Sequence, residues 1–138
     1  FAKGSGINVI VENHGSYSSK GSWLASVIKG TGMDNCGTLP DFGNFCVKRG
    51  PDGCAESYDR YKGTRELMPF AKGVSAKTYD FDEAGNCIET DYNKIMAILK
   101  DTGFNGYVGI EYEGDKLSEE EGIRKTKALL EKAGASLA

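Results

Sequence analysis

Acidic residues stand at the ends of apolar segments at three widely separated places in this chain. Glu12 follows the apolar run at residues 7–11, Asp41 follows CGTLP, and Glu111 follows YVGI. In α/β folds the loops after the C-terminal ends of parallel strands carry the ligand site, because those loops vary while the sheet stays fixed. Carboxylates gathered there repel one another, and a divalent cation is the usual means of keeping them ionised together. The pattern therefore predicts an oxygen-rich metal site of the kind that suits Mg²⁺ or Mn²⁺.

Further polar side chains stand at these three segment ends and in one more segment between the second and the last, residues 70–77. They are His14 after the first segment, Asn44 after the second, Ser75 and Lys77 in the third, and Glu113 in the fourth. If the segments are neighbouring parallel strands, these groups converge on one rim, where a metal polarises a carbonyl and a carboxylate moves a proton. Two alternatives stay open. Glu12 and His14 equally suit a solvated loop, and Lys77 equally suits an ion pair with Asp41 or Glu111 across the rim.

Alternating strands and helices are expected to position these residues. Strands are expected at residues 7–11, 36–42, 70–77 and 107–110, and the first is apolar enough to be buried on both faces. Helices are expected at about 20–29, 58–68, 91–103 and 118–130. Ser18 or Ser19 is the candidate N-cap of the first helix, Asp91 of the third and Ser118 of the fourth. Residues 46–56 are rich in turn formers and are expected to form a loop.

Four strand–helix units in succession predict an α/β fold with a parallel sheet and right-handed crossovers. A complete (β/α)8 barrel needs about 250 residues, so the 138 residues of this chain suffice for half of one. A small open α/β sheet is the alternative. In either case the composition, with 39% hydrophobic residues, is that of a single domain over residues 1–138.

The formal net charge is −3 and there is no basic run, so nucleic-acid and membrane-surface partners are not expected. No apolar run approaches the roughly 18 residues of a membrane span. We expect a cytoplasmic location, with the periplasm as the alternative, since the sequence starts at Phe1 and its natural beginning is not seen.

The four cysteines show neither a CxxC pair nor the Cys/His spacing of a zinc site. Cys46 and Cys54 flank the turn-rich segment VKRGPDG and would close a short disulfide loop in an oxidising compartment. Reduced thiols throughout, as in a cytosolic protein, are the favoured interpretation.

The segments ENHG, LPDFGNF, YDRY, AKGVSAKTYDFD and GYVGIEYEG occur in this order along the chain. Together they resemble the sugar phosphate isomerase/epimerase family, the xylose-isomerase-like TIM barrels. The resemblance covers nearly the whole chain but only the C-terminal half of the family's barrel, strands five to eight. It implies isomerisation or epimerisation of a sugar or sugar phosphate, by proton transfer next to a carbonyl through an enediolate. The chain would then be part of a larger enzyme.

The resemblance also implies roles for individual residues. In the family a divalent metal is held by Glu, Asp, His and Glu, and the matching positions here are Glu12, Asp41, Ser75 and Glu111. Because serine is a poor ligand, the site is expected to be weakened, completed by water or His14, or lost. Mg²⁺ or Mn²⁺ is the implied ion, with Co²⁺ or Zn²⁺ as alternatives. Glu12 and Glu111 would be the acid/base pair.

The implied substrate contacts are His14, Asn44, Lys77 and Glu113. Asn44 stands three residues after Asp41, where related epimerases often carry a substrate-binding histidine.

The sequence bears on two other functions. Apurinic endonucleases have a related barrel but bind zinc through many histidines, so one histidine in an acidic chain argues against that activity. A non-catalytic sugar-binding or assembly module with a degenerate metal site is the main alternative, and Ser75 motivates it.

Half a barrel by itself would expose two sheet edges and an apolar inner face. We therefore expect a homo-oligomer in which two halves complete a barrel-like core. An isolated half is not expected to be fully active, because the other strands normally supply substrate contacts.

Overall fold

The computed structural model describes residues 1–135. Its centre is formed by parallel strands: β1 (Val9–Glu12), β2 (Cys36–Leu39), β5 (Val74–Thr78) and β6 (Val108–Tyr112). β1 pairs with β2 and β5 pairs with β6, while isolated parallel bridges, Thr38 to Ala71 and Asp41 to Ser75, join the two pairs. The spatial order β1–β2–β5–β6 therefore follows the sequence order.

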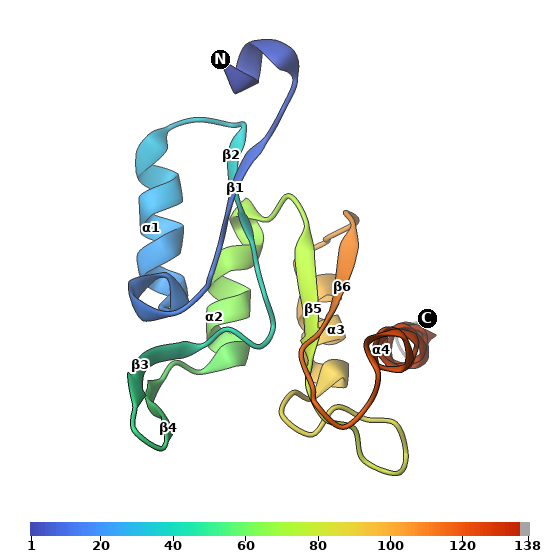
Figure 1. The fold of residues 1–138 in the computed structure, drawn as a ribbon. Helices are drawn as coiled ribbons and strands as arrows, with labels where there is room; N and C mark the ends of the chain where they lie inside the picture. Colours follow the sequence, from blue (N-terminus) through green and yellow to red (C-terminus); the bar gives the residue numbers. More distant parts are fainter. Residues whose placement is uncertain (136–138) are drawn as a thin grey trace.

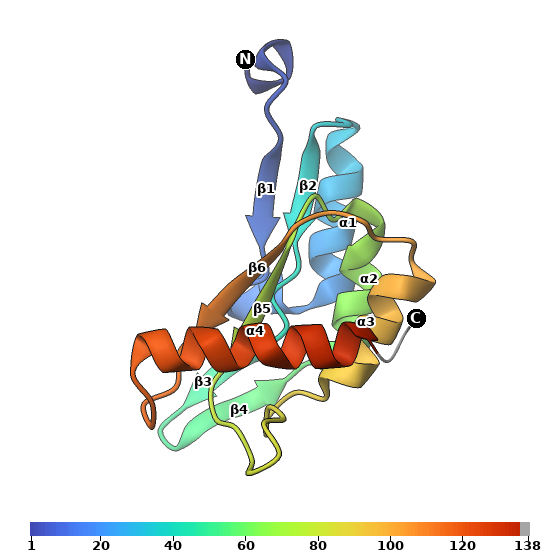
Figure 2. The same cartoon turned by 90° about the vertical axis from the view of Figure 1, so that its right-hand side faces the viewer.

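Each of these strands leads to a helix. The helices are α1 (Gly21–Thr31), α2 (Arg60–Leu67), α3 (Tyr92–Asp101) and α4 (Glu119–Ala135), with short 3-10 turns η1 (Ala2–Ser5), η2 (Ser16–Ser19) and η3 (Met68–Phe70). In Figure 2, α1, α2 and α3 lie to one side of the strands, and α4 crosses beside β5 and β6 (Figures 1 and 2). The arrangement confirms the expected half of a (β/α)8 barrel.

The main core lies between the strands and α3 and α4. The apolar stripe of α3 supplies Ile95, Ile98 and Leu99, and β5 supplies Val74 and Ala76 from alternate positions. A smaller cluster of Leu24, Ile28 and Leu67 fills the space between α1 and α2. Both clusters therefore hold the strands against the helices.

Two of the three N-caps expected from the sequence are confirmed, and Asp59, which was not among them, caps α2 by accepting from the Lys62 N–H. The Asp91 side chain accepts bonds from the backbone N–H groups of Asn93 and Lys94, and Ser118 and Glu121 form a reciprocal capping box before α4. The expected cap at Ser18 or Ser19 is wrong, because α1 starts after Lys20 without a side-chain cap. Both serines lie in η2 and bond to the loop after β1 instead.

Strand β1 corrects the expectation of a strand buried on both faces. Val9, Ile10 and Val11 are 49%, 42% and 40% exposed. Successive side chains of a strand point to opposite faces, so both faces of β1 are open. Among the described residues β1 pairs with β2 alone, and the helix that follows it, α1, packs on α2 and β2.

Residues 46–56 correct a second expectation, since they contribute to an antiparallel hairpin and not to an irregular loop. Strands β3 (Cys46–Gly50) and β4 (Gly53–Ser57) pair across the turn at Pro51 and Asp52. A disulfide joins Cys46 to Cys54, with 5.7 Å between the Cα atoms, so the favoured interpretation of reduced thiols is wrong for this pair. Cys36 and Cys87 are free. Within residues 1–135, no helix combines the length and the apolar character needed to cross a membrane.

Candidate metal centre and active site

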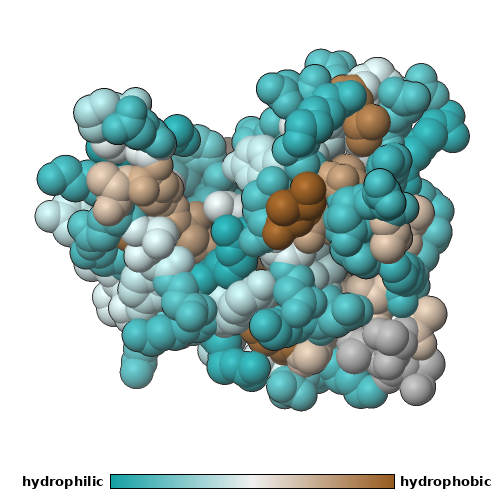
Figure 3. Space-filling view, turned by 90° about the horizontal axis from the view of Figure 1, so that it is seen from below, coloured by the Kyte–Doolittle hydropathy of each residue, from teal (hydrophilic) through white to brown (hydrophobic). Residues whose placement is uncertain are grey.

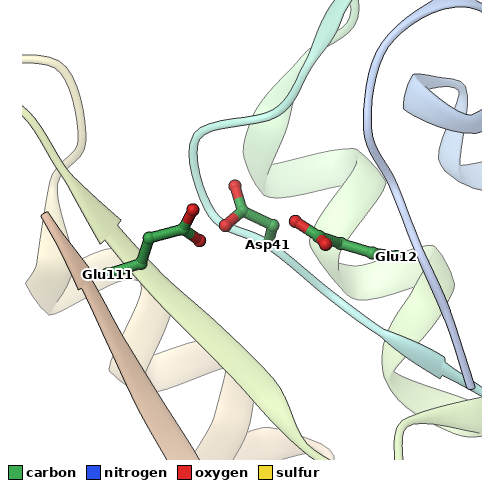
Figure 4. Close-up of side chains that lie close together, drawn as sticks. All are labelled: Glu12, Asp41 and Glu111. Carbon is green, nitrogen blue, oxygen red and sulfur yellow. The ribbon is translucent and has the colours of Figure 1, made fainter. Parts of the chain in front are cut away.

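Glu12, Asp41 and Glu111 meet at one end of the strands (Figure 4). Glu12 ends β1, Asp41 follows β2, and Glu111 lies in β6 opposite Lys77 of β5. One oxygen from each carboxylate lies within 4.8 Å of the others. Parallel pairing thus brings together the three acidic residues that the sequence pattern predicts to converge. Figure 3 shows this end of the molecule, toward which the strand arrows of Figure 2 point, as mostly hydrophilic.

Asp41 is the centre of the cluster and is fully buried. Its Oδ1 accepts bonds of 2.8 Å from the N–H groups of Gly43 and Asn44, whereas its buried Oδ2 has no hydrogen-bond partner within residues 1–135. Burial raises the pKa of Asp41 to about 6, against the opposing effect of the nearby Lys77 ammonium. Buried polar atoms are almost always bonded, so an unpartnered carboxylate oxygen beside two other carboxylates fits a cation ligand. The donor set, all oxygen, suits a hard divalent ion.

Glu111 receives a hydrogen bond on each of its oxygens. Ser75 Oγ donates to Oε2 at 2.9 Å, and Lys77 Nζ lies 3.2 Å from Oε1. Burial alone would raise the pKa of Glu111, but the bonds from Ser75 and Lys77 outweigh it and lower that pKa. Ser75 therefore lies at the cluster as a donor to one of its carboxylates.

Lys77 is the buried cation of the rim, with a side chain only 1% exposed. Its Nζ lies 3.2 Å from Glu111 Oε1, 3.1 Å from Glu113 Oε2 and 3.2 Å from Asn44 Oδ1. Burial lowers the pKa of this ammonium, but the carboxylates of Asp41, Glu113 and Glu111 raise it by more than burial lowers it. The pKa of Lys77 therefore lies above the ordinary value. The ion pair left open by the sequence is thus present, with Glu111 and Glu113 as its partners.

Asn44 connects the two ends of the cluster. Its Nδ2 donates to Glu12 Oε1 at 3.0 Å while its Oδ1 accepts from Lys77. Its backbone carbonyl accepts from Ser19 Oγ at 2.7 Å and from Asn13 Nδ2 at 3.1 Å. The loop after β2 is therefore tied to the loop after β1, and Glu12 is held toward Asp41.

Asn13 is a site residue that sequence analysis missed. It is fully buried, donates from Nδ2 to the carbonyl of Asp41 at 3.0 Å, and accepts from the Asp41 N–H at 2.8 Å. No local pattern marks it, because Asn13 directly follows β1 and its partner Asp41 lies 28 residues further along the chain. A buried amide there must be bonded to backbone, and the backbone in reach is the next strand end.

His14 lies outside the cluster. It is exposed, and within residues 1–135 its ring has no hydrogen bond, while its backbone N–H donates to Ser18 Oγ at 2.9 Å. The loop alternative fits His14 in this structure, and His14 does not complete the carboxylate set.

The fold and the rim define half of an α/β barrel with acidic side chains at the C-terminal ends of its strands. This chain belongs to the family described as xylose isomerase-like TIM barrel, whose model it matches over residues 1–133. No curated protein sequence matches it.

Solved structures of sugar 3-epimerases share the fold. An L-ribulose 3-epimerase superposes with a TM-score of 0.62 at 18% identity, covering 98% of this chain and 47% of that protein. A D-psicose 3-epimerase from Clostridium cellulolyticum H10, solved with D-tagatose, gives 0.60 at 14% identity, covering 98% and 51%. Another D-psicose 3-epimerase, in the presence of D-fructose, gives 0.60 at 15% identity, covering 98% and 50%. This chain therefore spans about half the length of these epimerases.

Proposed function

We propose that this chain carries the metal ligands and the acid/base residues of a sugar isomerase or epimerase, as strands five to eight of the barrel. The observation that supports this most is the cluster of Glu12, Asp41 and Glu111 around the unpartnered Oδ2 of buried Asp41. The family match and the likeness to sugar 3-epimerase folds are consistent with it. As in the sequence-based hypothesis, the substrate class is a sugar or sugar phosphate.

Glu12, Asp41 and Glu111 would hold the divalent ion, for which Mg²⁺ or Mn²⁺ is the best match and Co²⁺ or Zn²⁺ the alternative. When bound, such an ion polarises a substrate carbonyl and stabilises the negative charge of an enediolate. Ser75 is the weakest member of the proposed set, since its hydroxyl is already engaged with Glu111.

Glu12 and Glu111 would exchange the proton. They approach Asp41 from opposite sides, Glu12 from β1 and Glu111 from β6 (Figure 4). A flat enediolate between them would present one face to each carboxylate, so removal by one and return by the other would invert the carbon. Asn44 holds Glu12, while Ser75 and Lys77 hold Glu111, which keeps both bases in fixed positions.

A second candidate function is a sugar-binding or assembly module without turnover. The bond from Ser75 to Glu111 favours it, because a neutral fourth ligand is missing where the family has histidine. Asn44 and Glu113, both at the cluster, would contact sugar hydroxyls in either function.

The open strand positions support a proposal about assembly. β1 and β6 each have one neighbour in the sheet, and Ile10 and Ile110 are exposed on them. We infer that two copies associate through these edges to complete a barrel-like core.

The Cys46–Cys54 disulfide supports the periplasmic alternative over the cytoplasmic location expected from the sequence.

Proton exchange tests the catalytic proposal directly. In D₂O with Mn²⁺ and a ketose such as fructose, the protein should incorporate deuterium at the carbon next to the carbonyl, detected by NMR. Glu12→Gln should reduce the exchange rate at least about a hundredfold, because a general base is lost. Glu120→Gln, in the exposed first turn of α4, is the matched control and should leave the rate unchanged. Mn²⁺ binding without any exchange would favour the binding module. If the protein neither binds Mn²⁺ nor exchanges the proton, the enzyme proposal is refuted.

A further inference from the structure

We propose that Lys77 is a built-in counter-ion of the carboxylate cluster, which holds Glu111 in place and limits the affinity of the site for divalent ions. This inference rests on the proposed function, because it concerns the same cluster. It assigns to Lys77 a positioning role in place of the substrate contact that the family resemblance implies.

The first observation is the saturation of the ammonium. A lysine side chain has three N–H donors and no acceptor. Nζ of Lys77 has three acceptors at 3.1 to 3.2 Å, on Glu111, Glu113 and Asn44. No donor is left for a hydroxyl or phosphate of a substrate unless one of these bonds breaks.

The second observation is that Lys77 cannot easily leave. Its stem lies against Gly43, where an added Cβ would approach Lys77 Cδ to 2.9 Å, so the absence of a side chain at Gly43 makes room for the lysine. Its backbone carbonyl accepts a 2.8 Å bond from Tyr92 Oη, which anchors the strand behind it. The ammonium is therefore a fixed charge, unlike that of an exposed lysine, which moves freely in solvent.

The third observation is competition for the same oxygens. A cation held by Glu12, Asp41 and Glu111 would use a carboxylate of Glu111 whose Oε1 faces Lys77 and whose Oε2 faces Ser75. Like charges a few ångströms apart in a partly buried site repel strongly, since little water screens them. A bound ion must tolerate the ammonium or displace it from Glu111, and either requirement weakens binding.

Mn²⁺ affinity of the purified chain, measured by isothermal titration calorimetry, tests the inference. Lys77→Met keeps the length and packing of the stem and removes the charge, so it should bind Mn²⁺ at least about tenfold more tightly than the natural chain. Lys77→Gln should shift the affinity in the same direction. This variant serves if Lys77→Met does not fold, because the glutamine amide can still donate to a carboxylate. The matched control is Lys116→Met, which removes an exposed ammonium 2.7 Å from Asp80 and should change the affinity less than twofold.

Thermal unfolding without metal gives an independent readout. Lys77→Met should lower the melting temperature of the metal-free chain, because the clustered carboxylates lose their counter-ion, and Mn²⁺ should raise it more than in the natural chain. Equal or weaker Mn²⁺ binding by both Lys77 variants would overturn the counter-ion role while leaving the proposed function intact. Absence of Mn²⁺ binding in every variant would overturn the metal site and this inference together.

Discussion

Strands β1 and β5 show opposite relations between sequence and burial. β1 reads VIVE and is the more apolar of the two, yet all three of its apolar side chains are exposed. β5 reads VSAKT and carries a serine, a lysine and a threonine, yet every one of its residues is buried. The difference lies in position, because β5 is central, between β2 and β6, and β1 is at an edge.

The two strands differ in how their side chains are accommodated. In β5, every buried polar side chain is bonded: Ser75 to Glu111, Lys77 to two carboxylates and an amide, and Thr78 to Thr126 of α4. In β1, the apolar side chains are exposed, and exposed apolar patches are typical of interaction surfaces. A polar strand can thus be structural and an apolar strand can be an interface.

The largest effect is expected from placing a charge on each strand. Ala76→Asp buries a carboxylate in the core of β5 without a partner and should lower the free energy of unfolding by about 3–5 kcal/mol. Val11→Asp on β1 should cost less than about 1 kcal/mol, since its side chain reaches water. Urea unfolding followed by circular dichroism measures both. Similar losses for the two variants would mean that β1 is covered in solution, by a second copy or another partner.

The next effect concerns Asn13, which ties the edge strand to the site. Asn13→Ala leaves the N–H and carbonyl of Asp41 without their side-chain partner and should cost about 2–4 kcal/mol of stability. Because these bonds position a cluster carboxylate, Mn²⁺ affinity should fall about tenfold or more in calorimetry. Asn93→Ala, on the exposed start of α3, is the control. Loss of stability with unchanged Mn²⁺ affinity would limit Asn13 to a folding role.

The sequence predicts the features that depend on local residues and misses those that depend on distant neighbours. Strand–helix periodicity and the caps at Asp91 and Ser118 depend on local residues, so the order of elements and the convergence of Glu12, Asp41 and Glu111 were predictable. The exposure of β1 depends on what lies beside it, which a window of sequence does not contain. The hairpin after β2 was missed because its turn residues dominate two short strands. Asn13 was missed because its partners lie in the next strand end, 28 residues away.

A smaller effect is expected at the polar pair behind β5. Thr126 Oγ1 donates to the carbonyl of Gly122, so at the 2.6 Å contact Thr78 is the donor. Thr78→Val removes that donor and should cost about 1 kcal/mol. Thr126→Val should cost more, about 1–3 kcal/mol, because it leaves the buried hydroxyl of Thr78 without an acceptor. Urea unfolding of both variants and of the double variant measures the pair, and a greater loss in Thr78→Val than in Thr126→Val would contradict this donor assignment.

The smallest effect on folding, and the sharpest test of the edge strand, is expected from Ile10→Lys. The side chain is 42% exposed, so lysine should change the free energy of unfolding of the separated chain by no more than about 0.5 kcal/mol. In an assembly that completes the barrel, the same ammonium would be buried without a partner, and association should be lost. Light scattering should then give a multiple of the 14.9 kDa chain mass for the natural sequence and the single-chain mass for the variant. A natural chain that stays single at high concentration would show that self-association does not cover β1, and an assembly that survives Ile10→Lys would place its interface elsewhere. The variant Lys127→Met on α4 should leave the mass unchanged, because this side chain is exposed and its ion pair is with Glu131 of the same helix.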